Sequence, residues 1–399
     1  MRTWILTIGL VMVSTCSLAS EASPPWSMDF LADPLAANWT VEPPSALGKT
    51  GRWTNGEIRT CGPRWQSPQF AVEPFQYYRL AVRSKVQPPS MWAAVFYDAA
   101  GQQIASDHYS ALDASLQWTE QEFFFRARAD AATCQLWFHP LEPSDGNLSL
   151  SRVAVQPATR QEVARWADRI FAGLPPLQIV LPAGRCDHLP RTMEALRAGR
   201  PLRIVMLGDS IVNDTSNSAW EVLLERLYPK ARIEIISSVR GGTGCQYYQQ
   251  ENRVEQYVIR YKPDLLVIGG ISNGFNVEPI RTVIHQVRRQ ISPEILVLTD
   301  PVGVHGDPRA WPLMMIEPGE HGDGARQRLV TLGPYRMGLK EMAAEEAVEY
   351  FDMGTLWDGY IAHCGKPYEY YLRDPVHANE RGRQILARML VGFFSPPGK

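Results

Sequence analysis

The period of the hydrophobic pattern changes once along this 399-residue chain, close to residue 200. Beyond that point, short apolar runs alternate with helical patterns, in which apolar residues recur every three or four positions. Five of these runs are strand candidates: Arg203 to Leu207, Ile233 to Ile236, Leu265 to Ile268, Ile295 to Leu298 and Val348 to Phe351. Strands joined by crossover helices are covered on both faces. This part of the chain therefore predicts a five-stranded parallel sheet in a three-layer α/β/α domain.

The stretch before residue 157 has short alternating segments that are broken by Pro, Gly and Asp. Tyr78 to Arg83 alternates cleanly, Asp98 to Gly101 has the composition of a turn, and no long helical period is present. The pattern favours an all-β sandwich of jelly-roll type. The segments Trp92 to Gly101 and Trp118 to Glu120 loosely resemble the carbohydrate-binding-module type of jelly roll.

Tryptophan is frequent in this first half, and two interpretations stay open. An indole ring can stack on the apolar face of a sugar, but aromatic residues at strand spacing more often fill a sandwich core. The residues concerned are Trp39, Trp53, Trp65, Trp92, Trp118 and Trp137.

Two domains suit the length, and a hydrophobic content of 45% can fill two cores. Two short amphipathic helices, Arg160 to Ala172 and about Arg191 to Ala198, separate the two patterns. We therefore expect a sandwich domain over 26–157, a helical connector over 158–200 and the α/β domain over 201–395.

The first 22 residues have the features of a secretory signal peptide. Arg2 precedes the apolar run Ile5 to Val13, small residues follow, and the run is too short for a membrane span. We expect a secreted or periplasmic protein. A lipid anchor at Cys16 is disfavoured, because Thr15 is bulkier than the small residues that usually precede such a cysteine.

The composition limits the classes of partner and cofactor that this chain could bind. Lys and Arg number 40 against 42 Asp and Glu, so no overall charge would attract nucleic acid or an anionic membrane. Cys61 with Cys134, and Cys245 with Cys364, could form disulfides, and the alternative is a set of small buried residues. We expect no cofactor and no metal, because four histidines show no ligand-like spacing: His285, His305, His321 and His363. The oligomeric state is not predicted.

Two distant segments could supply a catalytic triad. Gly208-Asp209-Ser210 ends the first strand of the α/β half, at the edge where ligands bind in parallel sheets. Asp374 stands three residues before His377, near the end of the chain. A carboxylate on one imidazole nitrogen would leave the other free to take a proton from Ser210. Taken singly, Ser210 could also be a helix cap, and Asp374 a loop acid.

These blocks resemble those of the SGNH (GDSL-like) hydrolase family, from about Leu202 to Phe394. The resemblance implies an oxyanion hole formed by the backbone N–H groups of Ser210 and Gly241 with the side-chain amide of Asn273. Asn273 stands one residue later than in the family's Gly-x-Asn-Asp block, and the following Asp is missing. Ser272 is the substitute donor.

Three polar residues beside these blocks are candidates for substrate binding: Asp209, Asn213 and Ser272. Asp214 could also shape the pocket, or cap the next helix. The segment from His305 to Gly333 is rich in Gly, Pro and charge, so we expect a loop over the cleft.

The resemblance implies an SGNH-type carboxylic ester hydrolase that removes acetyl or similar small acyl groups from a carbohydrate or a small ester. Transfer of the acyl group to a sugar hydroxyl instead of water is one alternative. A non-catalytic carbohydrate-binding protein is the other, and the imperfect third block favours it.

Overall fold

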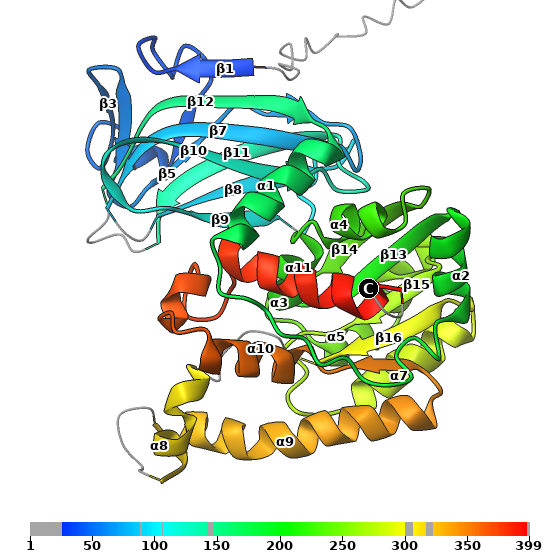
Figure 1. Cartoon of the computed structure of the whole chain (residues 1–399). Helices are drawn as coiled ribbons and strands as arrows, with labels where there is room; N and C mark the ends of the chain where they lie inside the picture. Colours follow the sequence, from blue (N-terminus) through cyan, green and yellow to red (C-terminus); the bar gives the residue numbers. More distant parts are fainter. Residues whose placement is uncertain are drawn as a thin grey trace, which may run out of the picture.

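In the computed structural model of the chain, residues 26–87, 90–105, 107–141, 147–299, 306–316 and 322–396 are described. The predicted leader and Cys16 lie outside the described residues. Figure 1 shows a β-sandwich, in blue and cyan, lying on an α/β domain. The predicted order of an all-β part and an α/β part is confirmed.

The sandwich consists of two antiparallel six-stranded sheets. The first has the order β10-β7-β12-β4-β3 with β1 beside β12, and the second has the order β2-β5-β11-β8-β9 with β6 beside β11. The strands are β1 (Trp26–Asp29), β2 (Thr40–Glu42), β3 (Gly51–Thr54), β4 (Glu57–Thr60), β5 (Arg64–Gln66), β6 (Phe70–Ala71), β7 (Tyr77–Val86), β8 (Ser90–Tyr97), β9 (His108–Leu112), β10 (Ser115–Arg126), β11 (Thr133–Pro140) and β12 (Leu148–Ala158).

The tryptophans of the sandwich divide between its core and its surface. Trp39, Trp65 and Trp92 are buried and pack in the core between the sheets, as large aromatic residues at strand spacing usually do. The guanidinium of Arg64 covers the ring of Trp137, and Trp118 is half-buried. Most of this aromatic surface therefore stabilises the fold.

The second domain contains a parallel sheet of the order β14-β13-β15-β16-β17. All of its neighbouring strands are parallel, which confirms the predicted five-stranded sheet. The strands are β13 (Pro201–Gly208), β14 (Arg232–Val239), β15 (Leu265–Ile268), β16 (Glu294–Leu298) and β17 (Glu349–Phe351).

Helices cover both faces of this sheet because successive side chains of a strand point to opposite faces. Ile204 and Met206 of β13 pack with α1, α2, α4, α10 and α11, whereas Val205 and Leu207 pack with α5, α7 and α9. The helices are α1 (Arg160–Ala172), α2 (Pro190–Ala198), α3 (Ser210–Ser216), α4 (Trp220–Leu227), α5 (Cys245–Tyr248), α6 (Arg253–Tyr257), α7 (Glu278–Arg288), α8 (Trp311–Ile316), α9 (Gly322–Glu345), α10 (Met353–His363) and α11 (Glu380–Phe394).

The connector helix α1 has the bounds that the sequence predicts. Thr159 and Glu162 form a reciprocal capping box at its start, and Gly173 follows its last residue. Trp166, on the apolar side of this helix, donates its indole N–H to the backbone oxygen of Glu122 in the sandwich. α1 is therefore packed between the domains, beside α11 (Figure 1).

Two expectations are corrected. The segment expected to be a loop from His305 to Gly333 contains α8 and the first half of α9, within which Pro334 lies. Leu339 and Met342 of α9 are buried against the sheet, and this packing outweighs the weak helix propensity of Gly and Pro. The suggested disulfides are also wrong, because Cys61, Cys134, Cys186, Cys245 and Cys364 are free.

Within the described part of the chain, no helix combines the length and the apolar character needed to cross a membrane.

Candidate active site

Ser210 lies where the first strand of the parallel sheet passes into a helix. β13 ends at Gly208, Asp209 is the N-cap of α3, and Ser210 is the first residue of α3. A Cβ atom at Gly208 would lie 2.5 Å from the backbone oxygen of Gly269, so only glycine lets the chain after β15 approach so closely. The hydroxyl of Ser210 is therefore held at the carboxyl edge of the sheet, where open α/β sheets bind ligands.

The structure brings together the three residues predicted as a triad. The hydroxyl of Ser210 lies 2.8 Å from Nε2 of His377, and Nδ1 of His377 lies 2.8 and 2.9 Å from the two oxygens of Asp374. The side chains of His377 and Asp374 are each 22% exposed, so the relay is accessible from solvent. The catalytic roles of the three residues stay predictions.

The ionisation of Asp374 fits this geometry. Burial alone would raise its pKa, but the hydrogen bond from His377 and the nearby charge of Arg373 hold the pKa of the carboxyl below its usual value. An ionised Asp374 accepts the Nδ1–H of the imidazole, so Nε2 carries the lone pair that can accept the proton of Ser210.

The backbone holds the loop that carries His377. The peptide N–H of Arg373 donates to the backbone oxygen of His377 over 3.0 Å, and Leu372 forms an isolated β-bridge with Ala378. Asn379 caps α11 with its side-chain oxygen and donates its side-chain N–H groups to the backbone oxygens of Tyr370 and Leu372. Asn379 was not among the predicted site residues, although Asn directly before a helical pattern is a helix-start signal.

The predicted oxyanion-hole residues lie in the turns that follow β14 and β15. Gly241 is exposed, with nothing within 4 Å of a Cβ built on it, so a ligand can approach its backbone. Asn273 is buried; its side-chain oxygen accepts from the N–H of Cys245 at 2.8 Å and its side-chain nitrogen donates to the backbone oxygen of Gly270 at 3.3 Å. Asn273 thus joins the two turns, and its role as an oxyanion donor stays a prediction.

Asp209 is held inside the fold, and its predicted contact with a substrate stays a prediction. Its side chain is buried, and its two oxygens accept the backbone N–H groups of Ile211 at 2.9 Å and of Ser272 at 2.7 Å. Burial raises the pKa of this carboxyl, and the hydrogen bonds oppose that shift. Asp209 thus positions the nucleophile turn against the chain after β15. Ser272 is half-buried beside it, and its contact with substrate stays a prediction.

Asn213, the other residue predicted to bind substrate beside Ser210, contacts the sandwich, and its contact with substrate stays a prediction. It is buried, its side-chain nitrogen donates to the backbone oxygen of Asp107 at 2.6 Å, and its side-chain oxygen accepts from Arg128 and Ser237. Both Asp107 and Arg128 belong to the sandwich, so Asn213 is part of the contact between the domains. Asn213 was predicted to line the pocket because it is close to Ser210 in sequence. Its burial by the sandwich was not foreseen, because burial by another domain has no local sequence signal.

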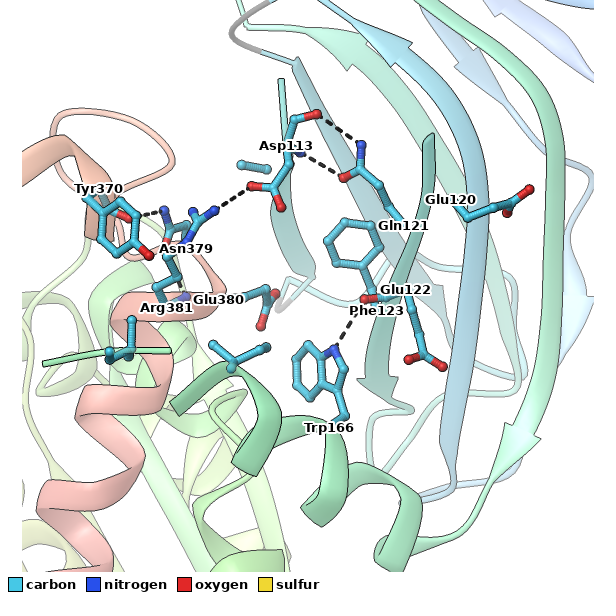
Figure 2. Close-up of a pocket in the computed structure, with 13 residues that line it drawn as sticks. Asp113, Glu120, Gln121, Glu122, Phe123, Trp166, Tyr370, Asn379, Glu380 and Arg381 are labelled. Carbon is cyan, nitrogen blue, oxygen red and sulfur yellow. Dashed lines mark hydrogen bonds and ion pairs between the residues drawn. The ribbon is translucent and has the colours of Figure 1, made fainter. Parts of the chain in front are cut away.

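A cleft of about 320 Å³ lies between the sandwich, α1 and the start of α11. Figure 2 shows Arg381 reaching from α11 to Asp113 across this cleft, with Trp166 and Phe123 on its other side. Asn379 also lines this cleft, but Ser210 and His377 do not, so the cleft is separate from the relay.

Within the ranges that the structure describes, no group of three His, Cys, Asp or Glu residues is arranged to hold a metal ion.

Comparison with solved structures finds esterases of low similarity. A two-domain esterase active on acetylated mannans is 18% identical with a TM-score of 0.37, over 52% of this chain and 52% of that chain. The same esterase co-crystallised with mannopentaose is 18% identical with a TM-score of 0.38, over 54% and 56%. A catalytic mutant of an acetylxylan esterase from Geobacillus stearothermophilus is 17% identical with a TM-score of 0.37, over 48% and 94%. The chain thus spans about half the length of the two-domain esterase.

A search of curated proteins finds no significant match. Among protein families, the GDSL-like Lipase/Acylhydrolase family matches residues 206–385, a range that includes Ser210, Asp374 and His377. Residues 206–385 therefore form a domain of the GDSL-like (SGNH) lipase/acylhydrolase type.

Proposed function

We propose that this protein is a serine esterase that hydrolyses O-acyl esters, above all O-acetyl esters of a carbohydrate. The observation that carries the proposal is the hydrogen-bonded relay from Asp374 through His377 to the hydroxyl of Ser210. Such a relay activates a serine as a nucleophile, and the family of the domain is one of acylhydrolases.

In the acylation step, the oxygen of Ser210 attacks the ester carbonyl carbon while Nε2 of His377 takes the hydroxyl proton. The negative charge that develops on the carbonyl oxygen is stabilised by the backbone N–H groups of Ser210 and Gly241 and by the amide of Asn273. Each such donor contributes about 3 to 4 kcal/mol to transition-state stabilisation. The leaving alcohol then takes the proton from Nε2, and the acyl group stays on Ser210 as an ester.

In the deacylation step, a water molecule gives its proton to Nε2 of His377 and attacks the acyl carbon. The second tetrahedral intermediate collapses, the oxygen of Ser210 regains the proton, and the carboxylic acid is released. Asp374 stays ionised throughout, where it holds the imidazole and stabilises the imidazolium.

The carbohydrate part of the proposal is supported by the sandwich. Trp118 of β10 is half-buried, and the cations of Lys85 and Arg83 lie 4.6 and 5.6 Å from its ring centroid. An indole ring that is partly open to solvent can stack on the apolar face of a pyranose. The predicted leader supports a location outside the cytoplasm, where polysaccharides are found.

Hydrolysis of an aryl acetate tests the esterase itself. We expect turnover by the wild type and only background release by Ser210→Ala, with Ser115→Ala, a serine of the sandwich, as the matched control at the wild-type rate. Equal rates in the wild type and in Ser210→Ala would refute the serine mechanism.

Acetate release from a panel of acetylated polysaccharides tests the substrate class. We expect Trp118→Ala to lower kcat/KM on a polymer while its rate on the aryl acetate is unchanged. Trp53→Ala is the matched control, since Trp53 is an exposed tryptophan of the same sheet. Activity on aryl esters with no release from any polymer would contradict the carbohydrate part alone.

A further inference from the structure

Asp214 connects the nucleophile helix to the loop that carries the catalytic histidine. It lies four residues after Ser210 on α3 and is buried. One carboxylate oxygen accepts from Arg373 and from Arg383, each at 2.7 Å, and the other accepts the backbone N–H of Ala378 at 3.1 Å. Because Ala378 directly follows His377, Asp214 fixes the backbone of the histidine relative to α3.

Arg383 carries this connection from the α/β domain into the sandwich. Its side chain is 0% exposed, and it lies on α11. Besides Asp214, its guanidinium donates to Glu380 at 2.8 Å, to Nε2 of His108 at 3.1 Å and to the backbone oxygen of Tyr109. His108 and Tyr109 belong to β9 of the sandwich.

Glu380 adds a further contact with the sandwich, because its carboxylate accepts a hydrogen bond from the hydroxyl of Ser110 at 2.6 Å. Burial would raise its pKa, but Arg383 and His108 lower the pKa of Glu380 to about 2. Burial, together with Arg383, lowers the pKa of His108 to about 4. At neutral pH the cluster therefore contains charged Glu380, Asp214 and Arg383 beside a neutral imidazole. We name this cluster, His108, Ser110, Asp214, Glu380 and Arg383, the buried seam.

A second set of sandwich residues holds the far end of the nucleophile helix. Arg126 donates to the backbone oxygen of Ser216 at 3.1 Å, and Arg128 donates to the side-chain oxygen of Asn217 at 3.1 Å. Ser216 is the last residue of α3 and Asn217 is its C-cap, so two cations meet the negative end of the helix. The helix that carries Ser210 and the loop that carries His377 are thus both connected to the sandwich by hydrogen bonds.

We propose that the β-sandwich is a structural part of the catalytic centre, and that Arg383 and Asp214 are positioning residues that hold His377 over Ser210. This inference rests on the proposed function. A buried charge that lacks its partner raises the free energy of the fold. The buried seam therefore favours the one arrangement of the two domains in which every charge is paired. Geometry at the relay matters because a displacement of about 1 Å can lower a rate about a hundredfold.

α11 offers a matched control. Arg381 lies two residues before Arg383 and also pairs with the sandwich, through Asp113 at 2.9 Å, but its side chain is 31% exposed. It has no bond to Asp214. Arg383→Met and Arg381→Met therefore remove the same charge from the same helix, and only the first breaks the connection to the histidine loop.

The experiment measures kcat and KM for aryl acetate hydrolysis in the full chain of each variant, with folding checked by near-ultraviolet circular dichroism. We expect Arg383→Met to lower kcat about tenfold to a hundredfold with KM changed less than about twofold, because the interaction acts on the geometry of the transition state. Arg381→Met keeps the wild-type kcat. A folded Arg383→Met with the wild-type kcat, or an equal loss in Arg381→Met, would overturn the inference.

If Arg383→Met does not fold, two substitutions in the sandwich test the inference instead. Ser110→Ala removes one hydrogen bond to Glu380, and Asp113→Ala removes the exposed pair with Arg381. A lower kcat in Ser110→Ala than in Asp113→Ala supports the inference, and equal kcat values overturn it. Failure of the proposed function is a separate result, since the wild type and Ser210→Ala would then have equal rates.

Discussion

The relay and the buried seam consist of similar residues in different surroundings. Asp374 and His377 are each 22% exposed, whereas Asp214 and Arg383 are 1% and 0% exposed. A polar group that water can reach loses little when a partner is removed, but a buried charge without its partner costs about 3 to 5 kcal/mol. Exposure, and not residue type, therefore separates the relay from the residues that join the two domains. Substitutions in the relay should therefore act mainly on turnover, and substitutions of buried charges between the domains mainly on stability.

Asp374→Asn should lower kcat about ten-thousandfold, equivalent to about 5 kcal/mol, because the amide would hold the imidazole in the wrong tautomer. Steady-state kinetics on an aryl acetate measure this loss. The melting temperature should stay at the wild-type value, since the side chain is partly exposed. Turnover close to wild type would contradict the assignment of the relay.

Glu221→Gln should show the opposite pattern. Glu221 of α4 is 0% exposed and binds Arg126 and the hydroxyl of Tyr77, both from the sandwich. Removing its charge leaves Arg126 buried without an anion, so the free energy of unfolding should fall by about 3 to 5 kcal/mol. Denaturant titration measures it. A loss below about 1 kcal/mol, as for an exposed pair, would show that burial between the domains does not raise the cost of losing a charge.

His108→Gln should change how stability depends on pH. Burial lowers the pKa of His108 from 6.5 to about 4, so between these values the unfolded chain binds a proton that the folded chain does not. This contribution is complete above pH 6.5 and is lost as the pH falls towards 4. When the pH falls from 7.5 to 5, the free energy of unfolding should decrease by about 2 kcal/mol more in the wild type than in His108→Gln. The glutamine is a suitable replacement because its amide oxygen can still accept a hydrogen bond from Arg383.

Denaturant titrations at the two pH values test this prediction. Asp107, Glu380 and Arg383 are present in both proteins, so the difference between them isolates His108. The same loss in both proteins would show that His108 is not kept neutral in the folded state.

Asp113→Asn should have the smallest effect. Its carboxylate is 70% exposed and pairs with Arg381, and exposed pairs contribute about 1 kcal/mol or less. Thermal melts at low and high salt should differ little between the variant and the wild type. If Asp113→Asn lost as much stability as Glu221→Gln, solvent exposure would not determine how much a charge pair between the domains contributes.

The sequence was most informative where a feature depends on neighbouring residues. The five strands of the parallel sheet follow from apolar runs, and α1 follows from its periodicity and the glycine that ends it. The triad was predicted from two local patterns, a Gly-Asp-Ser strand end and an Asp three residues before a His, and the structure brings their side chains within hydrogen-bond distance.

The failures concern features that only tertiary packing decides. Asp209 and Asn213 were assigned to substrate because they flank Ser210, and their burial by the turn after β15 and by the sandwich was not foreseen. The first half of α9 was taken for a loop because its Gly residues weaken local helix propensity, while Leu339 and Met342 in the second half are buried and supply the compensating contacts. Arg373 and Arg383 were missed, because a charge that pairs across 150 residues or more leaves no pattern in a local window.

Covalent labelling tests whether His377 activates Ser210. A fluorophosphonate reacts with a serine only when a neighbouring base activates it, and the modified peptide is identified by mass spectrometry. The account predicts one label on Ser210 in the wild type and at least a hundredfold slower labelling in His377→Ala, at the lower end of the usual contribution of about 10² to 10⁴ from a general base. Labelling of Ser210 at the same rate in both proteins, or no labelling of Ser210 in the folded wild type, would contradict it.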